Sequence, residues 1–218
     1  MALAIFDLDN TLLNGDSDHA WGEFLVAREL VDGETFRLAN DNFYQQYKDG
    51  SLDIIAYLRF ALAPLRAYSL TELAELHRDF MAEFITPMRQ PKADALIRKH
   101  QDAGDHCMIM TATNTFITRP IALALGIPDI IGSEAEIVDG RYTGEPTGTP
   151  CFQEGKVILL KERVAAQGLS LAGSTFYSDS HNDLPLLQLV DNAVAVDPDE
   201  KLHKEATERG WPVISLRS

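Results

Sequence analysis

Five short apolar runs rich in β-forming residues recur along this chain, and segments with helical periodicity separate most of them. They are Leu3–Phe6, Cys107–Met110, Thr175–Tyr177, Ala193–Val196 and Val213–Leu216. Strands that alternate with helices form parallel sheets with right-handed crossovers. The sequence therefore predicts an α/β fold, and ligands of such a sheet bind beyond the carboxyl ends of its strands.

A hairpin is expected between the second and third runs. Residues Ala135–Val138 and Arg141–Thr143 flank Asp139-Gly140, a dipeptide that suits a tight type I′ turn. We therefore predict two antiparallel strands in this segment.

About seventy residues between the first two runs show only helical periodicity, with apolar side chains every three or four positions. Ser69 and Glu72 have the spacing of a capping box that would open the last helix of this segment, and Thr86-Pro87 marks its expected exit. The segment is too long for a simple crossover. We predict a small helical bundle, with the domains divided into residues 15–85 for the bundle and residues 1–14 and 86–218 for the core.

The carboxylates of Asp7 and Asp9 and the hydroxyl of Thr11 follow the first run where its strand would end. Asp7 can attack phosphorus, Asp9 can donate a proton, and the pair can hold a divalent cation that neutralises phosphate charge. The same residues also suit an Asx-turn without chemistry. The chain passes from the sheet into the helical bundle beside this loop. The bundle therefore either packs only around its own core or also covers the loop as a lid.

Polar residues also follow the second run, and they are Thr111, Ala112, Thr113 and Asn114. Their hydroxyl and backbone amide groups can bind phosphate oxygens, or they can cap the start of a helix. After the third run, Asp179 can complete a cation site with Asp7, and Asp183 can orient that site. This second cluster, which includes Asn182, would also suit the cap of the following helix.

Lys156 follows the loop Gly144–Gly155 and precedes an apolar helical pattern. Its ammonium group can neutralise a nucleophilic carboxylate and a phosphate together, although a lysine at a helix start is also compatible with simple solvation. Pro150 and Val157 stand where a nucleotide-binding P-loop requires a glycine and a hydroxyl residue. The sequence therefore lacks that motif.

In their order and their placement after strands, these four groups resemble the four motifs of haloacid dehalogenase superfamily phosphatases. The resemblance covers nearly the whole chain, and the helical insert after the first motif is similar to the small cap of subfamily IB, which includes phosphoserine phosphatase-like and histidinol-phosphatase-like enzymes. It implies a Rossmann-like core with a central first strand and a helical C1 cap. It also implies one Mg²⁺ ion bound by Asp7, Asp179 and the backbone carbonyl of Asp9.

The same resemblance makes Asp7 the nucleophile that forms an aspartyl-phosphate and Asp9 the residue that transfers protons. A carboxylate that coordinates Mg²⁺ cannot easily carry a proton, which also favours Asp9 for this role. Thr111 and Lys156 would hold phosphate oxygens, and Thr11 would support the loop. The remaining candidate contacts to phosphate or substrate in the core are Ala112, Thr113, Asn114 and Asn182.

Residues of the expected cap bear on the substrate. Asp16 replaces the glutamate that typically recognises the amine in phosphoserine phosphatases, and Asp18 adds a second carboxylate, unless both belong to a solvated loop. An acidic cap attracts a cationic leaving group and repels a second anionic group. Arg59 is the nearest candidate partner for a substrate carboxylate, but it could equally lie on the outer face of its helix. We expect a small phosphorylated metabolite, namely an amino-alcohol phosphate, with histidinol phosphate ahead of phosphoserine.

Three other functions are compatible with the sequence: a phosphotransferase, a phospho-accepting signalling domain and an inactive binding protein. Receiver-type signalling domains also use aspartate, Mg²⁺, a hydroxyl and lysine on a parallel sheet. Their acidic pair and acceptor aspartate lie on different strands, however, and they lack a seventy-residue lid. Every reactive position is filled in this chain, which argues against an inactive binding protein.

The composition argues against two classes of partner. With 33 acidic and 19 basic side chains among 218 residues, the net charge of -14 repels nucleic-acid backbones and anionic membrane surfaces. We find no run of about twenty apolar residues that would span a bilayer, and we expect no leader before the first strand. Cys107 and Cys151 lie far apart without metal-ligand spacing, which predicts free thiols in a reducing, cytoplasmic compartment. The sequence leaves the oligomeric state open.

Overall fold

The computed structural model describes residues 2–217 and arranges seven strands in one sheet, in the order β4-β3-β2-β1-β5-β6-β7. The strands are β1 (Leu3–Phe6), β2 (His106–Asn114), β3 (Ile130–Val138), β4 (Arg141–Thr147), β5 (Thr175–Ser178), β6 (Asn192–Val196) and β7 (Val213–Ile214). Neighbouring strands are parallel, except that β4 runs antiparallel to β3. The predicted α/β fold with a central first strand is confirmed.

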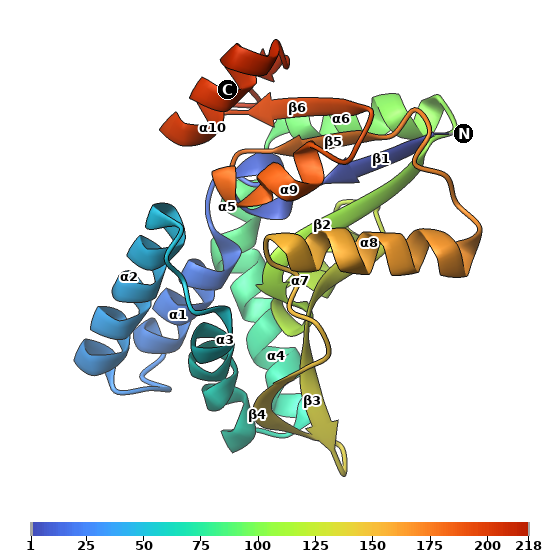
Figure 1. Cartoon of the computed structure of the whole chain (residues 1–218). Helices are drawn as coiled ribbons and strands as arrows, with labels where there is room; N and C mark the ends of the chain where they lie inside the picture. The colour runs from blue at the N-terminus through green and yellow to red at the C-terminus, as the bar shows by residue number, and fades with distance from the viewer. Residues whose placement is uncertain (1, 218) are drawn as a thin grey trace.

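Helices cover both faces of this sheet (Figure 1). On one face lie α6 (Pro91–Asp102) and α7 (Thr115–Ala124), and on the other lie α8 (Glu154–Gln167), α9 (Leu184–Leu187) and α10 (Glu200–Arg209). Because side chains alternate along a strand, Ala4 and Phe6 of β1 join the first core, while Leu3 and Ile5 join the second. All four are at most 2% exposed, as expected for a parallel strand covered on both sides.

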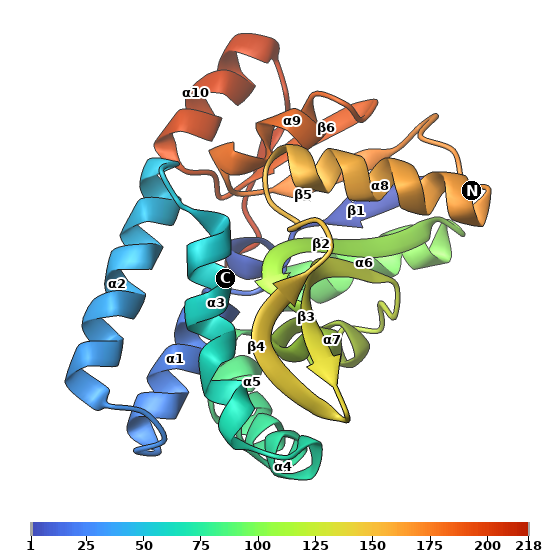
Figure 2. The ribbon, with the colours of Figure 1, turned by 60° about the horizontal axis from the view of Figure 1, so that its bottom comes forward.

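The strands β3 and β4 form the predicted hairpin. Val138 pairs with Arg141, and the turn residues Asp139 and Gly140 have φ angles of 50° and 74°, as a type I′ turn requires. The strand β3 begins at Ile130, earlier than predicted, because its first residues pair in parallel with β2 and only its second half belongs to the hairpin. Figure 2 shows the hairpin curving away from the sheet beside α3 (Ile54–Leu62).

The predicted helical bundle is present between β1 and β2. It consists of α1 (Ser17–Ala27), α2 (Gly33–Asp49), α3 with a short turn at Ala63–Ala67, and α4 (Leu70–Phe80). The capping box is confirmed, since the backbone N of Ser69 donates to Glu72 Oε2 at 2.7 Å and the backbone N of Glu72 donates to Ser69 Oγ at 3.3 Å. No helix within residues 2–217 combines the length and apolar character needed to cross a membrane.

The chain leaves the bundle later than the sequence indicates. Helical structure continues from α4 through Met81–Ile85 into α5 (Thr86–Met88), and the backbone becomes extended only at Arg89. A wide turn closed by the Thr86 backbone N and Met81 O lets the helix accommodate Pro87, which has no N–H to donate. Leu13 and Arg89 form an isolated bridge, so the two connections between bundle and core lie side by side. The division at residues 15–85 stays a prediction.

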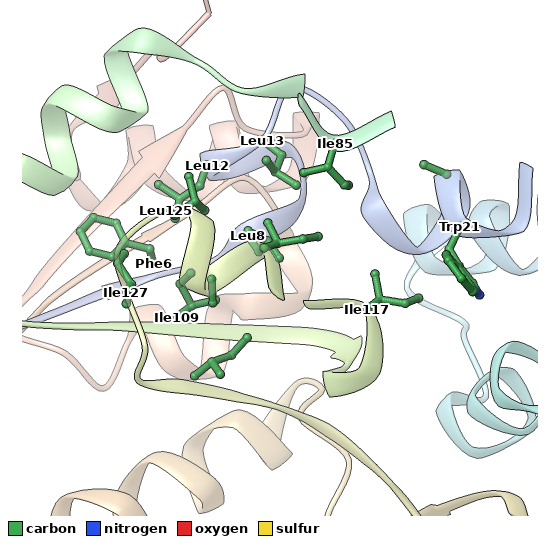
Figure 3. Close-up of a cluster of buried hydrophobic side chains, with 14 of the residues drawn as sticks. Phe6, Leu8, Leu12, Leu13, Trp21, Ile85, Ile109, Ile117, Leu125 and Ile127 are labelled. Atoms are coloured by element: carbon green, nitrogen blue, oxygen red, sulfur yellow. The ribbon is translucent and has the colours of Figure 1, made fainter. Parts of the chain in front are cut away.

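Aromatic packing holds the bundle against the core. Trp21 of α1 is 2% exposed and contacts the rings of Phe24 and Phe80 in the bundle and of Phe116 in α7. His77 of α4 adds a hydrogen bond of 2.9 Å between its Nε2 and the carbonyl of Ile117. The buried cluster in Figure 3 runs from Phe6 and Leu8 beside the sheet through Ile117 to Trp21. One continuous core therefore links bundle and sheet.

Replacing Trp21 with alanine should lower the free energy of unfolding by about 3–5 kcal/mol, because the change removes a buried aromatic side chain and leaves a cavity. Leu38→Ala on α2 is the control, since Leu38 is 66% exposed and its loss should change stability by less than about 0.5 kcal/mol. Urea unfolding followed by circular dichroism measures both variants. Equal, small losses would contradict the role assigned to Trp21.

Candidate active site

The carboxyl ends of β1, β2 and β5 meet at the edge of the sheet that faces the bundle (Figure 1). Asp7 directly follows β1, Asp179 directly follows β5, and Lys156 lies in the first turn of α8. The polar residues Thr111–Asn114 were expected after the second strand, but β2 continues through all four of them. The pairing register of β2 with β3 shifts between Met110 and Asn114, which marks an irregular strand end.

A tight loop after β1 presents Asp7 and Asp9 to this edge. Asn10 adopts a φ of 57°, and the backbone N of Leu13 donates to Leu8 O at 3.0 Å to close the turn. Arg217 holds the loop from outside, because its guanidinium donates to the carbonyls of Asn10 at 2.9 Å and Leu13 at 3.1 Å. Sequence reasoning missed Arg217, which lies outside every recognised motif.

Lys156 joins two buried carboxylates. Its Nζ lies 2.9 Å from Asp7 Oδ1 and 2.7 Å from Asp183 Oδ1, and the lysine side chain is 2% exposed. Burial alone would lower the pKa of Lys156, but the carboxylates of Asp183 and Asp7 outweigh this and hold the pKa above its usual value. Burial raises the pKa of Asp7 to about 7, against the opposing effect of Lys156. The ammonium group is therefore positively charged beside the candidate nucleophile.

The structure changes the role of Asp183. We expected Asp183 to orient the cation site, but its carboxylate contacts Lys156 and accepts a hydrogen bond of 2.7 Å from Ser178 Oγ. Ser178 stands where the fourth motif of the family often has glycine, and its hydroxyl serves to fix Asp183. Asp183 thus positions Lys156 rather than Asp179.

Asp179 has the contacts of a candidate cation ligand. Thr11 Oγ1 donates to Asp179 Oδ1 at 2.9 Å and accepts from the Asp179 backbone N at 3.0 Å, which matches the supporting role predicted for Thr11. Desolvation and the negative charge of Asp7 raise the pKa of Asp179 well above its usual value. Lys156 contacts Asp7 and Asp183, so one ammonium group accompanies the three carboxylates of Asp7, Asp179 and Asp183, which retain excess negative charge.

This excess charge fits a divalent cation. No group of three or more histidine, cysteine, aspartate or glutamate side chains within residues 2–217 is arranged to hold a metal. A cation between Asp7 and Asp179 would therefore take a further oxygen from the backbone, as the resemblance implies for the carbonyl of Asp9. Mg²⁺ typically binds one or two carboxylates together with water and phosphate oxygens.

Asp9 has surroundings that differ from those of Asp7. Its Oδ1 accepts from the backbone N of Ser17 at 2.7 Å, and its Oδ2 accepts from the hydroxyl of Thr113 at 2.9 Å and of Thr111 at 3.4 Å. Desolvation raises the pKa of Asp9 although these hydrogen bonds lower it. A carboxyl group with a raised pKa is suited to proton transfer. Ser17 was not recognised from the sequence, and Thr113 contacts the acid rather than an independent phosphate site.

A cavity of about 40 Å³ lies between this edge and the bundle. It is lined by Asp7, Asp9, Asn10, Asp16, Asp18, His19, Asn40, Phe43, Tyr44, Tyr47, Leu52, Ile54, Tyr57, Thr111, Ala112 and Thr113. The lining thus contains residues 111–113 and both predicted cap carboxylates. Burial raises the pKa of Asp18 to about 7, and desolvation together with Asp9 raises the pKa of Asp16 well above its usual value. The cavity is smaller than a phosphorylated metabolite, so the bundle must move to admit one.

Three predicted contact residues do not line this cavity. Asn114 accepts from the backbone N of Ile117 and caps α7. Arg59 is exposed on α3 and pairs with Glu145 of β4 at 2.7 Å. Asn114 and Arg59 therefore follow the alternatives that the sequence left open, a helix cap and an outward-facing side chain, and neither contacts the cavity in this conformation.

Asn182 is the third of these residues, and it contacts the bundle instead. Its Nδ2 donates to the carbonyl of Tyr47 at 2.9 Å, at the end of α2. Nearby, Lys201 Nζ donates to the carbonyl of Asp49 at 2.9 Å. Both contacts join the bundle to the core and hold it over the cavity.

The chain is similar to known proteins over most of its length. The family model described as haloacid dehalogenase-like hydrolase matches residues 4–188. A histidinol-phosphatase of Neisseria meningitidis serogroup C is 52% identical over 219 residues, which cover 99% of this chain and 99% of that protein.

Two solved structures share the fold. A protein with unknown function from Bordetella pertussis Tohama I has a TM-score of 0.93 and 43% identity, covering 99% of this chain and 98% of that one. A phospho-aspartyl intermediate analogue of phosphoserine phosphatase has a TM-score of 0.72 and 17% identity, covering 99% and 93%. The resemblance inferred from the four motifs is confirmed, and the chain belongs to the haloacid dehalogenase-like hydrolase family.

Proposed function

We propose that this protein is a magnesium-dependent phosphomonoesterase that hydrolyses a small amino-alcohol phosphate through an aspartyl-phosphate, with histidinol phosphate as the best candidate. The observation that carries the proposal is the charge of the cavity. Four carboxylates line it, from Asp7, Asp9, Asp16 and Asp18, and its described lining includes no lysine or arginine. Such a cavity favours a metal ion beside the phosphate and a cationic group on the leaving alcohol.

Asp7 acts as the nucleophile in this proposal. Lys156 holds its Oδ1, and the other carboxylate oxygen attacks phosphorus while the ester oxygen leaves with its bonding electron pair. Asp9 donates a proton to that oxygen, so the alcohol departs neutral at the reacting atom. Asp9 then takes a proton from the water that cleaves the aspartyl-phosphate, which releases inorganic phosphate and restores Asp7.

Mg²⁺ would be held by Asp7, Asp179 and the backbone carbonyl of Asp9. When bound, the ion supplies positive charge to the phosphate oxygens as charge redistributes around phosphorus. The ammonium group of Lys156, which contacts Asp7, contributes a second positive charge. The hydroxyl of Thr111, which lines the cavity, is a further donor available to phosphate.

The negative charge of the cavity favours histidinol phosphate over phosphoserine as the substrate. Phosphoserine carries a carboxylate as well as an amine, and Arg59, the expected partner of that carboxylate, pairs with Glu145 outside the cavity. The relative that is 52% identical is named histidinol-phosphatase. Cys107 and Cys151 are free thiols, which supports a reducing compartment, so the proposed place of action is the cytoplasm.

With Mg²⁺ present, we expect kcat/KM for histidinol phosphate to exceed that for phosphoserine by at least about tenfold, because only phosphoserine brings a carboxylate into the acidic cavity. Release of inorganic phosphate measures both reactions, and a chelator should abolish them. Added acceptor alcohols test for a phosphotransferase. Slow turnover of both compounds beside rapid cleavage of a sugar or lipid phosphate would refute this choice of substrate.

Removing the metal should make stability depend on pH. The pKa of Asp7 rises from 3.8 to about 7 on folding, so the folded state binds more protons than the unfolded state between these values. In a chelator, Asp7 alone should therefore lower the free energy of unfolding by roughly 2–4 kcal/mol as pH rises from 4 to 7, and the other carboxyl groups with a raised pKa, such as Asp18, should add to this fall. Mg²⁺ should restore much of this loss, and should do so less in Asp179→Asn. Urea titrations with and without Mg²⁺ measure the effect, and equal slopes would argue against a cation at this site.

Asp7→Asn should reduce turnover by at least about 10⁴-fold while preserving the fold, because an amide cannot form the covalent phosphoryl intermediate. Asp9→Asn should slow both the formation and the breakdown of that intermediate with an alkyl phosphate. With 4-nitrophenyl phosphate, whose leaving group needs no proton, only breakdown should be slowed, so that phosphoenzyme accumulates. Intact-protein mass spectrometry after rapid quenching detects the added phosphoryl group. In the wild type, a phosphoenzyme that persists for minutes would indicate a signalling domain instead of a phosphatase.

A further inference from the structure

Asp16 and Asp18 lie two residues apart at the start of α1, but their carboxylates have different surroundings. Asp16 is the N-cap of the helix, and its Oδ1 accepts from the backbone N of Asp18 at 3.0 Å and of His19 at 2.9 Å. These amides have no partner within the helix, so the Asp16 carboxylate is needed for a structural purpose. Asp16, which we expected from the sequence to recognise an amine, thus already uses one carboxylate oxygen to cap the helix.

Asp18 has the opposite character. Its residue is 6% exposed, it lines the cavity, and its Oδ2 is a buried oxygen without a hydrogen-bond partner among residues 2–217. A buried carboxylate oxygen without a donor is unfavourable for the folded protein. Such a group in a binding cavity indicates that a ligand supplies the missing donor.

The walls around Asp18 suit a flat cation. Burial raises the pKa of the Asp18 carboxyl group, and the nearby hydroxyl of Tyr57 opposes this rise, but Oδ2 of Asp18 still has no hydrogen-bond partner in the described part of the chain. The ring of Tyr57 packs on Phe43 with centroids 5.3 Å apart. The ring of Tyr44 is already occupied, because it stacks on His19 at 5.0 Å and the Nζ of Lys48 lies 4.1 Å from its centroid. All of these rings line the cavity. Aromatic faces attract cations, and they do so more strongly where water is excluded.

We propose that Asp18, rather than Asp16, is the anionic residue that binds the cationic group of the leaving alcohol, and that Phe43 and Tyr57 form the aromatic walls of this subsite. The ligand class is a protonated imidazole or an alkylammonium, with the planar imidazolium favoured by the aromatic walls. This inference rests on the proposed function, since it assigns the part of the substrate that does not react. Asp18 is a specificity residue and takes no part in phosphoryl transfer.

Binding of histidinol, the alcohol without its phosphate, tests the subsite without turnover. Calorimetric titration of the Mg²⁺-loaded protein should give a dissociation constant about 10- to 100-fold weaker for Asp18→Asn than for the wild type, the range for loss of a charge-assisted hydrogen bond. Glu34→Gln is the matched control. It removes one carboxylate from the exposed surface of the bundle, away from the cavity, and should leave the dissociation constant unchanged within about twofold.

Selectivity provides a second readout. In Asp18→Asn, the ratio of kcat/KM for histidinol phosphate to kcat/KM for the neutral ester 4-nitrophenyl phosphate should fall by about 10- to 100-fold, mainly through KM. The melting temperature should not fall, since the variant loses a buried charge with an unpartnered oxygen. Equal losses on both esters, or a lower melting temperature with an unchanged ratio, would show a structural role and overturn the proposal.

The two proposals fail in different ways. Wild-type protein that binds histidinol through Asp18 but does not hydrolyse histidinol phosphate would refute the proposed function and leave the subsite standing. If the wild type and Asp18→Asn hydrolyse histidinol phosphate equally well, the subsite alone is refuted. An Asp18→Asn variant that binds histidinol as tightly as the wild type would also overturn the assignment.

Discussion

The ammonium group of Lys156, buried between Asp7 and Asp183, constrains the site more than any other contact. It brings together the end of β1, the start of α8 and the segment after β5, which are distant in sequence. A buried charge that loses one partner is strongly destabilising, even where the intact pair adds little stability. The three segments are therefore held in one arrangement, and Thr11, through its two hydrogen bonds with Asp179, fixes the remaining carboxylate within the same frame.

This arrangement leaves the site with more negative than positive charge. Lys156 neutralises part of the charge near the sheet, while Asp16 and Asp18 bring further carboxylates from the bundle into the same cavity. The folded protein therefore retains repulsion that bound cations relieve, and binding is linked to stability. A cation beside the sheet would neutralise part of this negative charge, and a cation beside the bundle would neutralise another part. In our proposals, the chemistry at phosphorus and the choice of leaving group lie at opposite ends of one cavity.

Much of the fold and the reactive core could be predicted from sequence, because a parallel sheet gathers the residues that follow its strands at one edge. Residues on extended or helical segments were harder to assign. Along β2, Thr111 and Thr113 share a face and both reach Asp9, whereas Asn114 caps the next helix. Along α3, Tyr57 lines the cavity, but Arg59 is two residues further and so lies on a different side of the helix. Asn182 and Arg217 make contacts across the chain that no local pattern encodes.

The closed bundle also bears on how the enzyme works. A cavity of about 40 Å³ has room for only a few water molecules, which strengthens electrostatic interactions within it, and we expect it to open when a substrate enters. At the end of α2, polar contacts such as those of Asn182 with Tyr47 and Lys201 with Asp49 hold the bundle to the core. Such polar contacts are each worth only about 1 kcal/mol, so opening there has a low cost. The opposite side carries the aromatic core around Trp21, which is far more costly to separate. We therefore expect the bundle to rotate about the packed side chains around Trp21. The end of α2 would then move away from the core and admit substrate.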